Sequence, residues 1–378
     1  MIVINTIIMW IAAIGCLVGG MDRILGNKFG LGEKFEEGLN NMGPLALGMG
    51  GLICLAPVIA DVIGPAISPF FTAIGCDPAI FGAILPNDTG GYPLAMGLAH
   101  DPQAGLYSGL IVAAMFGATL TFLIPVGFAM IEKQDAPYYA QGMLIGMIAI
   151  PFGSVIGGLV AGFNAKMVFM NTLPIIVLVI LICFGLKFIP NQMIKGCEIF
   201  GRIILILCTI GLASAGFEAL TGFVIIPGMT SAYESLGIIG QIGIVLMGMV
   251  PIITLLIKFI EKPLTRLGER FGLDPTSSAC ILITVVNPLP IYGMYKDMNS
   301  KGKIINGAFT ACAAAILGDH LGFTAGVEPN YIFPVIAGKT CGGIIILILC
   351  SFLVRNTDNC DARSKEIAES LKAQGGGE

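Results

Sequence analysis

Long apolar runs alternate with short polar stretches along this chain. The runs long enough to cross a membrane lie at 2–20, 43–60, 105–131, 138–163, 167–187, 203–224, 236–260, 303–325 and 331–354. Each is close to the roughly 20 apolar residues that a helix needs to span a bilayer. The alternating segments of about ten residues that are typical of a membrane β-barrel are missing. The pattern therefore predicts an all-α polytopic membrane protein, with connectors at 21–42, 61–76, 188–202 and 261–273.

Two further apolar segments, 77–99 and 274–296, are interrupted by residues that break helices. The first contains Asn87-Asp88-Thr89-Gly90-Gly91-Tyr92-Pro93 and the second contains Asn287-Pro288-Leu289-Pro290. Paired glycines are entropically unfavourable in a helix, and proline has no backbone N–H to donate. Broken backbone at membrane depth is tolerated only inside protein or along a watery cavity. We therefore expect the other helices to hold these two broken segments face to face.

An internal repeat relates the two broken segments. Gly75-x-Asp77-Pro78 matches Gly272-x-Asp274-Pro275, and Pro93 matches Pro290 at the same spacing. Chance similarity is the alternative, because the identities are few. The repeat predicts one transmembrane domain over 1–354, with a first half at 1–163, a linker span at 167–187, a second half at 198–354, and a polar tail at 355–378. Inverted repeats with discontinuous helices are common in secondary transporters.

The distribution of basic residues predicts the topology. Lysine and arginine gather at 23–34, 187–202, 258–270, 296–303 and 355–372, and are absent from 61–76, 100–104, 225–235 and 326–330. Cytoplasmic loops carry the excess of basic residues. The N-terminus is then outside, the C-terminus is cytoplasmic, and both broken segments are re-entrant. The chain then has about nine transmembrane helices if neither broken segment crosses the membrane, and about eleven if both do.

Composition narrows the function further. Only 12% of residues are charged, against roughly 25% in soluble domains, and no basic cluster suited to nucleic acid occurs. Most of the 11 cysteines lie within apolar runs, which predicts buried thiols rather than a disulfide framework. The chain has two histidines and no phosphate-binding glycine loop or hydrolase motif, so we expect no metal, no cofactor and no catalytic site.

Asp88 is the candidate cation ligand at the first break. A carboxylate at membrane depth is costly and indicates a substrate or ion site. Carbonyls at the end of a half-helix near Leu85-Pro86 would add negative potential. The alternative is that Asp88, like its neighbour Asn87, forms a turn by binding local N–H groups. Pro93 is well placed to begin the next half-helix.

The second candidate cluster is Gly318-Asp319-His320-Leu321-Gly322-Phe323, within an expected span. Asp319 and Phe323 are four residues apart and share a helical face, whereas His320 points elsewhere. The cluster could bind a cation or relay a proton. Alternatively, Asp319 could form a structural ion pair with Lys339 of the last span.

Aromatic and amide side chains near the breaks complete the candidate site. Tyr92, Tyr292 and Phe323 could offer ring faces to an ammonium, although such aromatics more often serve packing. Asn287 could supply neutral hydrogen bonds at the second break, or could simply form the turn before Pro288.

At these residues the chain resembles the ethanolamine utilisation transporter family, whose members are integral inner-membrane components of bacterial ethanolamine catabolism. The matching stretches are Phe35-Glu36-Glu37-Gly38, Leu55-Ala56-Pro57-Val58, Asp88-x-Gly90-Gly91, Glu261-Lys262-Pro263-Leu264, Gly318-Asp319-His320-Leu321-Gly322-Phe323, Ile332-Phe333-Pro334 and Gly338-Lys339. The resemblance implies an inner-membrane permease with ethanolamine as its substrate. A homodimer is our working assumption for the assembly in the lipid bilayer.

The resemblance and the residues together favour an ethanolamine permease that works by facilitated diffusion or alternating access. A proton- or sodium-coupled amine carrier, with Asp319 and His320 as the coupling pair, is the alternative within the same class. A membrane enzyme acting on amino-alcohol lipids is the alternative from another class. An enzyme of the CDP-alcohol transferase type would need several aspartates at the start of one helix, a pattern that this sequence does not show.

Overall fold

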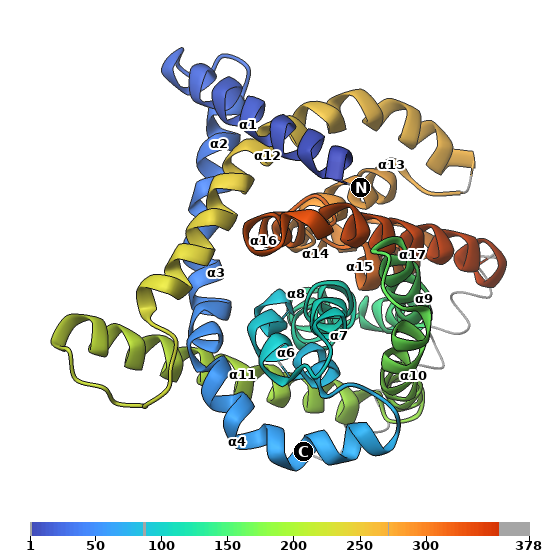
Figure 1. Ribbon diagram of the computed structural model, residues 1–378. Coiled ribbons are helices and arrows are strands. Elements are labelled where there is room, and N and C mark those ends of the chain that lie inside the picture. The colour runs from blue at the N-terminus through green and yellow to red at the C-terminus, as the bar shows by residue number, and fades with distance from the viewer. Residues whose placement is uncertain (1, 86–87, 271, 355–378) are drawn as a thin grey trace.

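The computed structural model describes residues 2–85, 88–270 and 272–354, and within these ranges the chain is helical and contains no strand. Figure 1 shows the helices arranged around a central group. The α-helices are α1 (Ile2–Ile24), α2 (Leu31–Asn40), α3 (Met42–Leu45), α4 (Gly51–Ala73), α5 (Phe81–Ile84), α6 (Tyr92–Leu98), α7 (Pro102–Leu106), α8 (Ile124–Met130), α9 (Ala136–Val160), α10 (Ala165–Phe188), α11 (Pro190–Thr221), α12 (Ala232–Arg270), α13 (Pro275–Val286), α14 (Leu289–Met294), α15 (Ser300–Ala313), α16 (Asp319–Val327) and α17 (Ile332–Leu353).

Shorter helical pieces join several of these helices. The π-helical segments are η1 (Ala46–Gly50), η4 (Tyr107–Gly117) and η5 (Thr119–Leu123). The 3₁₀ segments are η2 (Pro78–Ile80), η3 (Asp88–Gly91), η6 (Tyr295–Asp297) and η7 (Pro329–Tyr331). π-Helical turns within longer helices are frequently found at functional sites, and two of these three segments line the cavity described below.

Eight helices in the described ranges are long and apolar enough to cross a membrane. They confirm the all-α polytopic class and correspond to eight of the expected spans. The expected continuous span over 303–325 differs, because the structure breaks it into α15 and α16 with residues 314–318 between them. Two backbone N–H groups of residues 314–318 donate to carbonyls of α13. No sequence pattern reveals this pairing.

Three expected connectors are largely helical. Helix α4 continues to Ala73 despite containing Pro65 and Pro69, α11 begins at Pro190, and α12 extends to Arg270. Proline within a transmembrane helix is tolerated because neighbouring groups satisfy the freed backbone carbonyls. The prolines of the first and third of these stretches therefore lie in helix interiors, whereas Pro190 begins a helix.

The centre of the protein is built from α9, α15, α17 and η4. Helix α9 packs against α15 and α17, and every residue of η4 is buried. Small residues allow the close approach: a Cβ added at Gly146 of α9 would lie 2.3 Å from the carbonyl oxygen of Ala308 in α15. Small residues at helix–helix contacts are typical of membrane proteins, where close packing replaces hydrophobic burial as the attraction.

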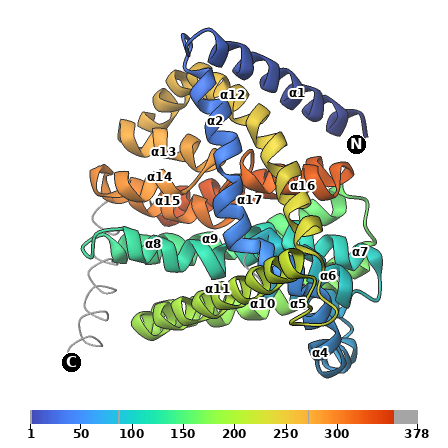
Figure 2. The ribbon, with the colours of Figure 1, turned by 90° about the vertical axis from the view of Figure 1, so that its left-hand side faces the viewer.

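The outer helices present apolar side chains to the surroundings. Trp10 and Leu17 of α1, Leu181 of α10 and Leu220 of α11 are exposed. Figure 2 shows α9, α10 and α11 lying close together, with α1 at the opposite edge of the molecule. An apolar surface of this extent is expected where helices contact lipid tails. The described cysteines, in contrast, are free thiols and most are buried, as the sequence predicted.

The first broken segment, 77–99, returns to the place where it started. Asp77 caps η2 by accepting from the backbone N of Ala79, and its carboxylate also accepts from the backbone N of His100 and Asp101, the latter at 2.9 Å. Gly75 precedes this cap with φ at 75°, a conformation that favours glycine. One carboxylate therefore holds both ends of the segment together.

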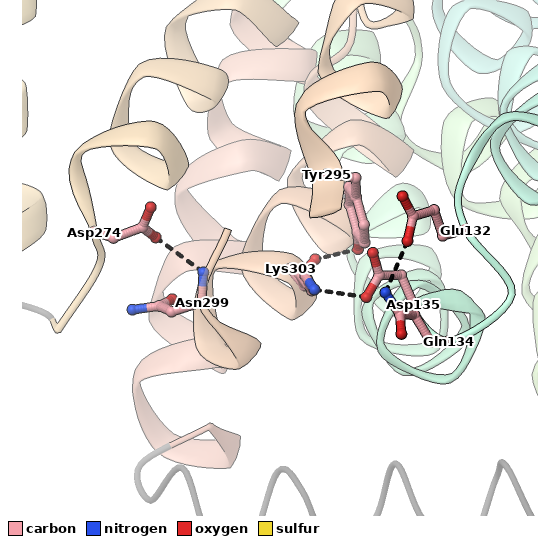
Figure 3. A network of polar contacts seen from close by, with 7 residues as sticks. All are labelled: Glu132, Gln134, Asp135, Asp274, Tyr295, Asn299 and Lys303. Carbon is pink, nitrogen blue, oxygen red and sulfur yellow. Dashed lines mark hydrogen bonds and ion pairs between the residues drawn. The ribbon is translucent and has the colours of Figure 1, made fainter. Parts of the chain in front are cut away.

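The second broken segment, 274–296, has the same construction. Asp274 caps α13 by accepting from the backbone N of Ser277, and its carboxylate accepts from the backbone N of Asn299 at 3.1 Å (Figure 3). Gly272 also has φ at 75°. The matching roles of Asp77 and Asp274 agree with the internal repeat, whose extension over both halves stays a prediction. Both segments are hairpins of broken helix.

An ion pair joins α15 to the start of α9, and a hydrogen bond joins the end of the second hairpin to the same lysine. Nζ of Lys303 in α15 lies 2.5 Å from Oδ1 of Asp135, which precedes α9, and the hydroxyl of Tyr295 donates to the carbonyl of Lys303 (Figure 3). Asp135 is buried and Lys303 is nearly so. These contacts set the position of α15, and through it that of residues 314–318.

Candidate functional site

In the second half of the chain, the non-helical segment 314–318 crosses the last turn of α13. The backbone N of Ala315 donates to the carbonyl of Thr284 at 2.8 Å, and that of Leu317 donates to Val285 at 3.0 Å. Gly318 follows, and a Cβ there would lie 2.0 Å from the carbonyl oxygen of Val286. Only glycine fits at this contact. The crossing therefore brings the end of α13 directly against the start of α16.

A cavity of about 240 Å³ lies beside this crossing. Its lining includes the second break at Asn287, the start of α16 at Asp319 and His320, and Glu37 and Asn41 from the first helices. The remaining lining residues are Pro44, Leu45, Gly48, Met49, Ala118, Phe122, Leu123, Leu246, Val250, Val286, Pro288, Leu289, Ala314, Ala315 and Gly318. The volume is several times the roughly 30 Å³ that a water molecule occupies in the liquid. A small organic molecule fits.

Asp319 and His320 both reach the cavity because α16 begins there. Asp319 is the first residue of the helix, and its Oδ1 accepts from the backbone N of His320 at 3.0 Å. The first N–H groups of a helix create positive potential, which stabilises a carboxylate at this position. The sequence prediction placed these residues within a continuous helix on different faces. The break at 314–318 brings them to the same cavity.

Lys339 of α17 is buried behind His320. Its Nζ lies 2.6 Å from Nδ1 of His320 and 2.5 Å from the carbonyl oxygen of Ala114 in η4. The sequence suggested Asp319 as the partner of this lysine. The hydrogen bonds described for the ammonium are instead with His320 and Ala114, and an additional ion pair with Asp319 stays a prediction.

Asn287 combines the two roles that the sequence left open. It ends α13, and its Oδ1 accepts from the backbone N of Leu289 at 3.0 Å, which makes it the turn residue before Pro288. It also lines the cavity. The amide is therefore held in place by the turn at the edge of the site.

The first break approaches the same cavity through its backbone. Segment η3 contacts η1 and η5, and both of these line the cavity. A Cβ on Gly90 would lie 2.8 Å from Cβ of the cavity residue Met49. Helix α5 ends at Ile84 and Pro93 lies in the first turn of α6, as predicted. Asn87 and the side chain of Asp88 lie outside the described residues.

Tyr92 and Phe323 form a contact of their own, apart from the cavity lining. Their rings meet edge to face with centroids 6.1 Å apart, and the Tyr92 hydroxyl donates to Oε1 of Glu328 at 3.0 Å. This contact joins the first hairpin to the end of α16. The sequence prediction missed Glu328, although an acidic residue at the end of an apolar helix, in a stretch without lysine or arginine, was a usable signal.

Tyr292 belongs to a buried aromatic cluster behind the cavity. Its hydroxyl lies 3.2 Å from that of Tyr139, which donates to the carbonyl of the lining residue Leu123 at 2.7 Å. The rings of Tyr139 and Tyr295 also meet edge to face. Tyr292 thus supports the cavity wall from the second layer, a role closer to the packing alternative than to a ring face offered to a ligand.

Comparison with known proteins gives a match along nearly the whole chain. A family model described as "Ethanolamine utilisation protein, EutH" matches residues 4–353. The chain belongs to the EutH family. This confirms the resemblance seen in the sequence and places Asp319, His320 and Lys339 within the matched range.

Relatives in the EutH family cover most of the chain. A protein of Listeria monocytogenes serotype 1/2a (strain 10403S), named probable ethanolamine permease EutH, is 47% identical over 342 residues, covering 90% of this chain and 92% of the relative. One of Salmonella typhimurium (strain LT2), with the same name, is 39% identical over 406 residues, covering 97% and 100%. A third relative, the uncharacterized protein YxeR of Bacillus subtilis (strain 168), is 42% identical over 342 residues, covering 90% of this chain and 92% of the relative. No solved structure gives a significant match.

Membership of the EutH family and the helices that could span a membrane show an integral membrane protein. Of the residues that the sequence singled out, the structure gathers Asn287, Asp319 and His320 around one cavity, with Lys339 directly behind. Tyr92 and Phe323 meet elsewhere, and Tyr292 lies in the second layer.

Proposed function

We propose that this protein transports ethanolamine across the inner membrane, with the cavity at the start of α16 as its binding site. One observation carries the proposal: the crossing of segment 314–318 with the end of α13 brings a carboxylate, an imidazole and an amide to the lining of one small cavity. Relatives in the EutH family are named probable ethanolamine permease, which supports ethanolamine as the ligand.

The chemistry of the lining matches a small ammonium alcohol. The carboxylate of Asp319 would accept hydrogen bonds from the ammonium, which has donors only. His320 and Asn287 would hydrogen-bond to the hydroxyl, which both donates and accepts. The apolar residues Met49, Leu246 and Val250 line the cavity as well and would surround the two methylene groups. Asp88, on the backbone segment η3 near Met49, remains our candidate for a second carboxylate.

The contact between Tyr92 and Glu328 supports alternating access. It lies near the end of the molecule where Asn5 of α1 meets Asn330 of η7. The cavity, in contrast, is lined by Glu37 and Asn41, which follow the basic stretch 23–34. We infer that the cavity opens to the cytoplasm and that Tyr92, Phe323 and Glu328 close the outer side. Opening the outer side would require Tyr92 to leave Glu328.

The coupled-carrier alternative has one observation in its favour, which is the direct contact between His320 and the buried Lys339. A proton exchanged within this pair would link transport to the proton gradient. The enzyme alternative has less support, because the relatives in the family that carry a functional name are named as permeases.

Reconstituted uptake tests the proposal and separates its versions. Purified protein in liposomes should accumulate labelled ethanolamine down its own concentration gradient, in excess of protein-free liposomes. The assay is best run at acidic pH, where the ammonium form predominates and leakage through lipid is small. Imposed proton and sodium gradients should leave the rate unchanged for facilitated diffusion. Uptake that is equal in liposomes with and without protein would contradict the proposal, and uphill transport driven by either gradient would establish the coupled version.

A further inference from the structure

Glu328 is a carboxylate at the end of an apolar helix and has a neutral group as its side-chain partner. It is the C-cap of α16 and is partly exposed. Its Oε1 accepts from the hydroxyl of Tyr92 at 3.0 Å. Among the side chains that the structure describes, no lysine, arginine or histidine pairs with Glu328. The stretch 326–330 also contains no lysine or arginine. The carboxylate is therefore left without a balancing positive charge in this part of the protein.

The end of α16 adds negative potential at the same place. The helix ends at Val327, and the backbone N of Glu328 donates to the carbonyl of Thr324 at 2.8 Å. The last carbonyl groups of a helix carry partial negative charge, which disfavours a carboxylate and stabilises a cation. Two separate features, the side chain and the helix end, therefore favour a positive charge beside Glu328.

Aromatic rings accompany this carboxylate. Tyr92 meets Phe323 edge to face, and the ring of Tyr331 packs on that of Phe163 with centroids 5.4 Å apart. The backbone N of Tyr331 donates to the carbonyl of Glu328 at 2.9 Å, which keeps Tyr331 within one turn of the carboxylate. Aromatic faces attract an ammonium through the ring quadrupole, and a carboxylate accepts its N–H groups. The combination is suited to an organic ammonium ion.

Resting on the proposed function, we propose that Glu328 is an outer binding site for the ammonium group of the substrate, and that this ammonium displaces the Tyr92 hydroxyl and so opens the outer side. The ammonium brings a full positive charge and three donors, whereas the phenol brings one neutral donor. The exchange frees the first hairpin, which carries Tyr92, from the end of α16. Asp319 lies at the other end of the same helix, roughly 13 Å away at 1.5 Å per residue, and receives the ammonium next.

Uptake of labelled ethanolamine separates this site from a purely structural hydrogen bond between Tyr92 and Glu328. Glu328→Gln keeps an oxygen that can accept from Tyr92 but removes the charge, so kcat/KM should fall about tenfold or more, the effect of one hydrogen bond to a charged group. Tyr92→Phe keeps the ring and removes the competing hydroxyl, so kcat/KM should rise. The matched control is Glu234→Gln, because Glu234 is exposed in the first turn of α12; it should leave kcat/KM unchanged. Parent-like uptake in Glu328→Gln, or a fall of similar size in Glu328→Gln and Tyr92→Phe, would overturn the proposal.

A labelling experiment detects the site without transport. In a variant without the native cysteines, Asn330→Cys places one thiol at an exposed position two residues after Glu328 and keeps the backbone carbonyl that accepts from Asn5. A cationic methanethiosulfonate with a trimethylammonium group should label this thiol several times faster than an anionic one with a sulfonate group. Glu328→Gln should reduce that ratio. External ethanolamine hydrochloride should slow the cationic reagent more than sodium chloride at the same concentration does.

The protection by ethanolamine requires no change at Glu328, so a folding defect in Glu328→Gln leaves the proposal testable. Equal slowing by the two salts would show ionic screening alone and would overturn the proposal. If the parent protein moved no ethanolamine, the proposed function would fail, whereas selective protection of the thiol at position 330 would still establish an ammonium site. Transport without that protection would reject the outer site and leave the proposed function in place.

Discussion

The carboxylate of Asp274 accepts the backbone N–H of Asn299 at 3.1 Å and so connects the start of the second hairpin to its end. The same carboxylate caps α13 through Ser277. Because one side chain serves both ends, Asp274→Ala should lower the free energy of unfolding by about 1–3 kcal/mol, more than the roughly 1 kcal/mol typical of a helix cap alone. Thermal unfolding in lipid or mild detergent measures the change.

The control for Asp274 is another aspartate of the same region. Asp297 in η6 is exposed, and Asp297→Ala should change stability by less than about 0.5 kcal/mol, as for most surface substitutions. Asp77→Ala should resemble Asp274→Ala, because Asp77 holds the first hairpin in the same way. Equal melting temperatures for Asp274→Ala and Asp297→Ala would show that the hairpin does not depend on this carboxylate.

The ion pair between Lys303 and Asp135 is also expected to stabilise the fold. Lys303→Met would leave the buried carboxylate of Asp135 without its cation, and removing one partner of a buried ion pair typically costs about 3–5 kcal/mol. The double variant Lys303→Met with Asp135→Asn should recover much of that loss. Lys34→Met, which breaks the exposed pair with Glu37, should cost about 0–1 kcal/mol. A single variant no less stable than the double would exclude a coupled pair.

Asp319 is expected to bind the ammonium of the substrate. Asp319→Asn should reduce ethanolamine uptake about tenfold or more, because a hydrogen bond between charged groups contributes about 1.5–3 kcal/mol. If Asp319 instead serves mainly to neutralise Lys339, the single variant should give little folded protein, and adding Lys339→Met should restore both yield and uptake. Folded yield and uptake of the two single variants and the double variant separate these roles. We expect the double variant to fold and remain inactive.

Asp88 is predicted to act at the first break. Its backbone segment η3 contacts η1 and η5, which line the cavity, so Asp88→Asn should weaken ethanolamine uptake strongly while membrane insertion stays normal. Asp61→Asn is the matched control, since Asp61 is exposed on α4. Uptake at the parent rate in Asp88→Asn would assign this aspartate to the turn alone.

The orientation of the protein follows from the second hairpin. Its ends lie together, so single cysteines introduced at Arg270 and Ser300, in a variant without the 11 native cysteines, should react with an impermeant thiol reagent from the same side. The basic residues of both stretches predict the cytoplasmic side. A cysteine at His100, beside the ends of the first hairpin, should react from the outside. Labelling of Arg270 and Ser300 from opposite sides would contradict the re-entrant topology.

The sequence was sufficient for the class of fold and for the positions of both breaks. Apolar runs of bilayer length have few alternatives to a membrane helix, because unpaired backbone groups are too costly in lipid. Glycine and proline act through local backbone geometry, so the ends of α5 and α13 and the start of α6 could be predicted from Gly90-Gly91, Pro93 and Asn287. The motif around Asp319 and His320 was sufficient to suggest the family.

Tertiary structure alone decided which of these residues meet. The break between α15 and α16 exists because the N–H groups of Ala315 and Leu317 pair with carbonyls of α13, and no local pattern encodes a partner about thirty residues away in sequence. That break turns Asp319 and His320 toward one cavity. Lys339 contacts His320 for the same reason: a buried ammonium takes whichever acceptors the packing of α16, α17 and η4 places within reach, and sequence spacing does not determine that packing.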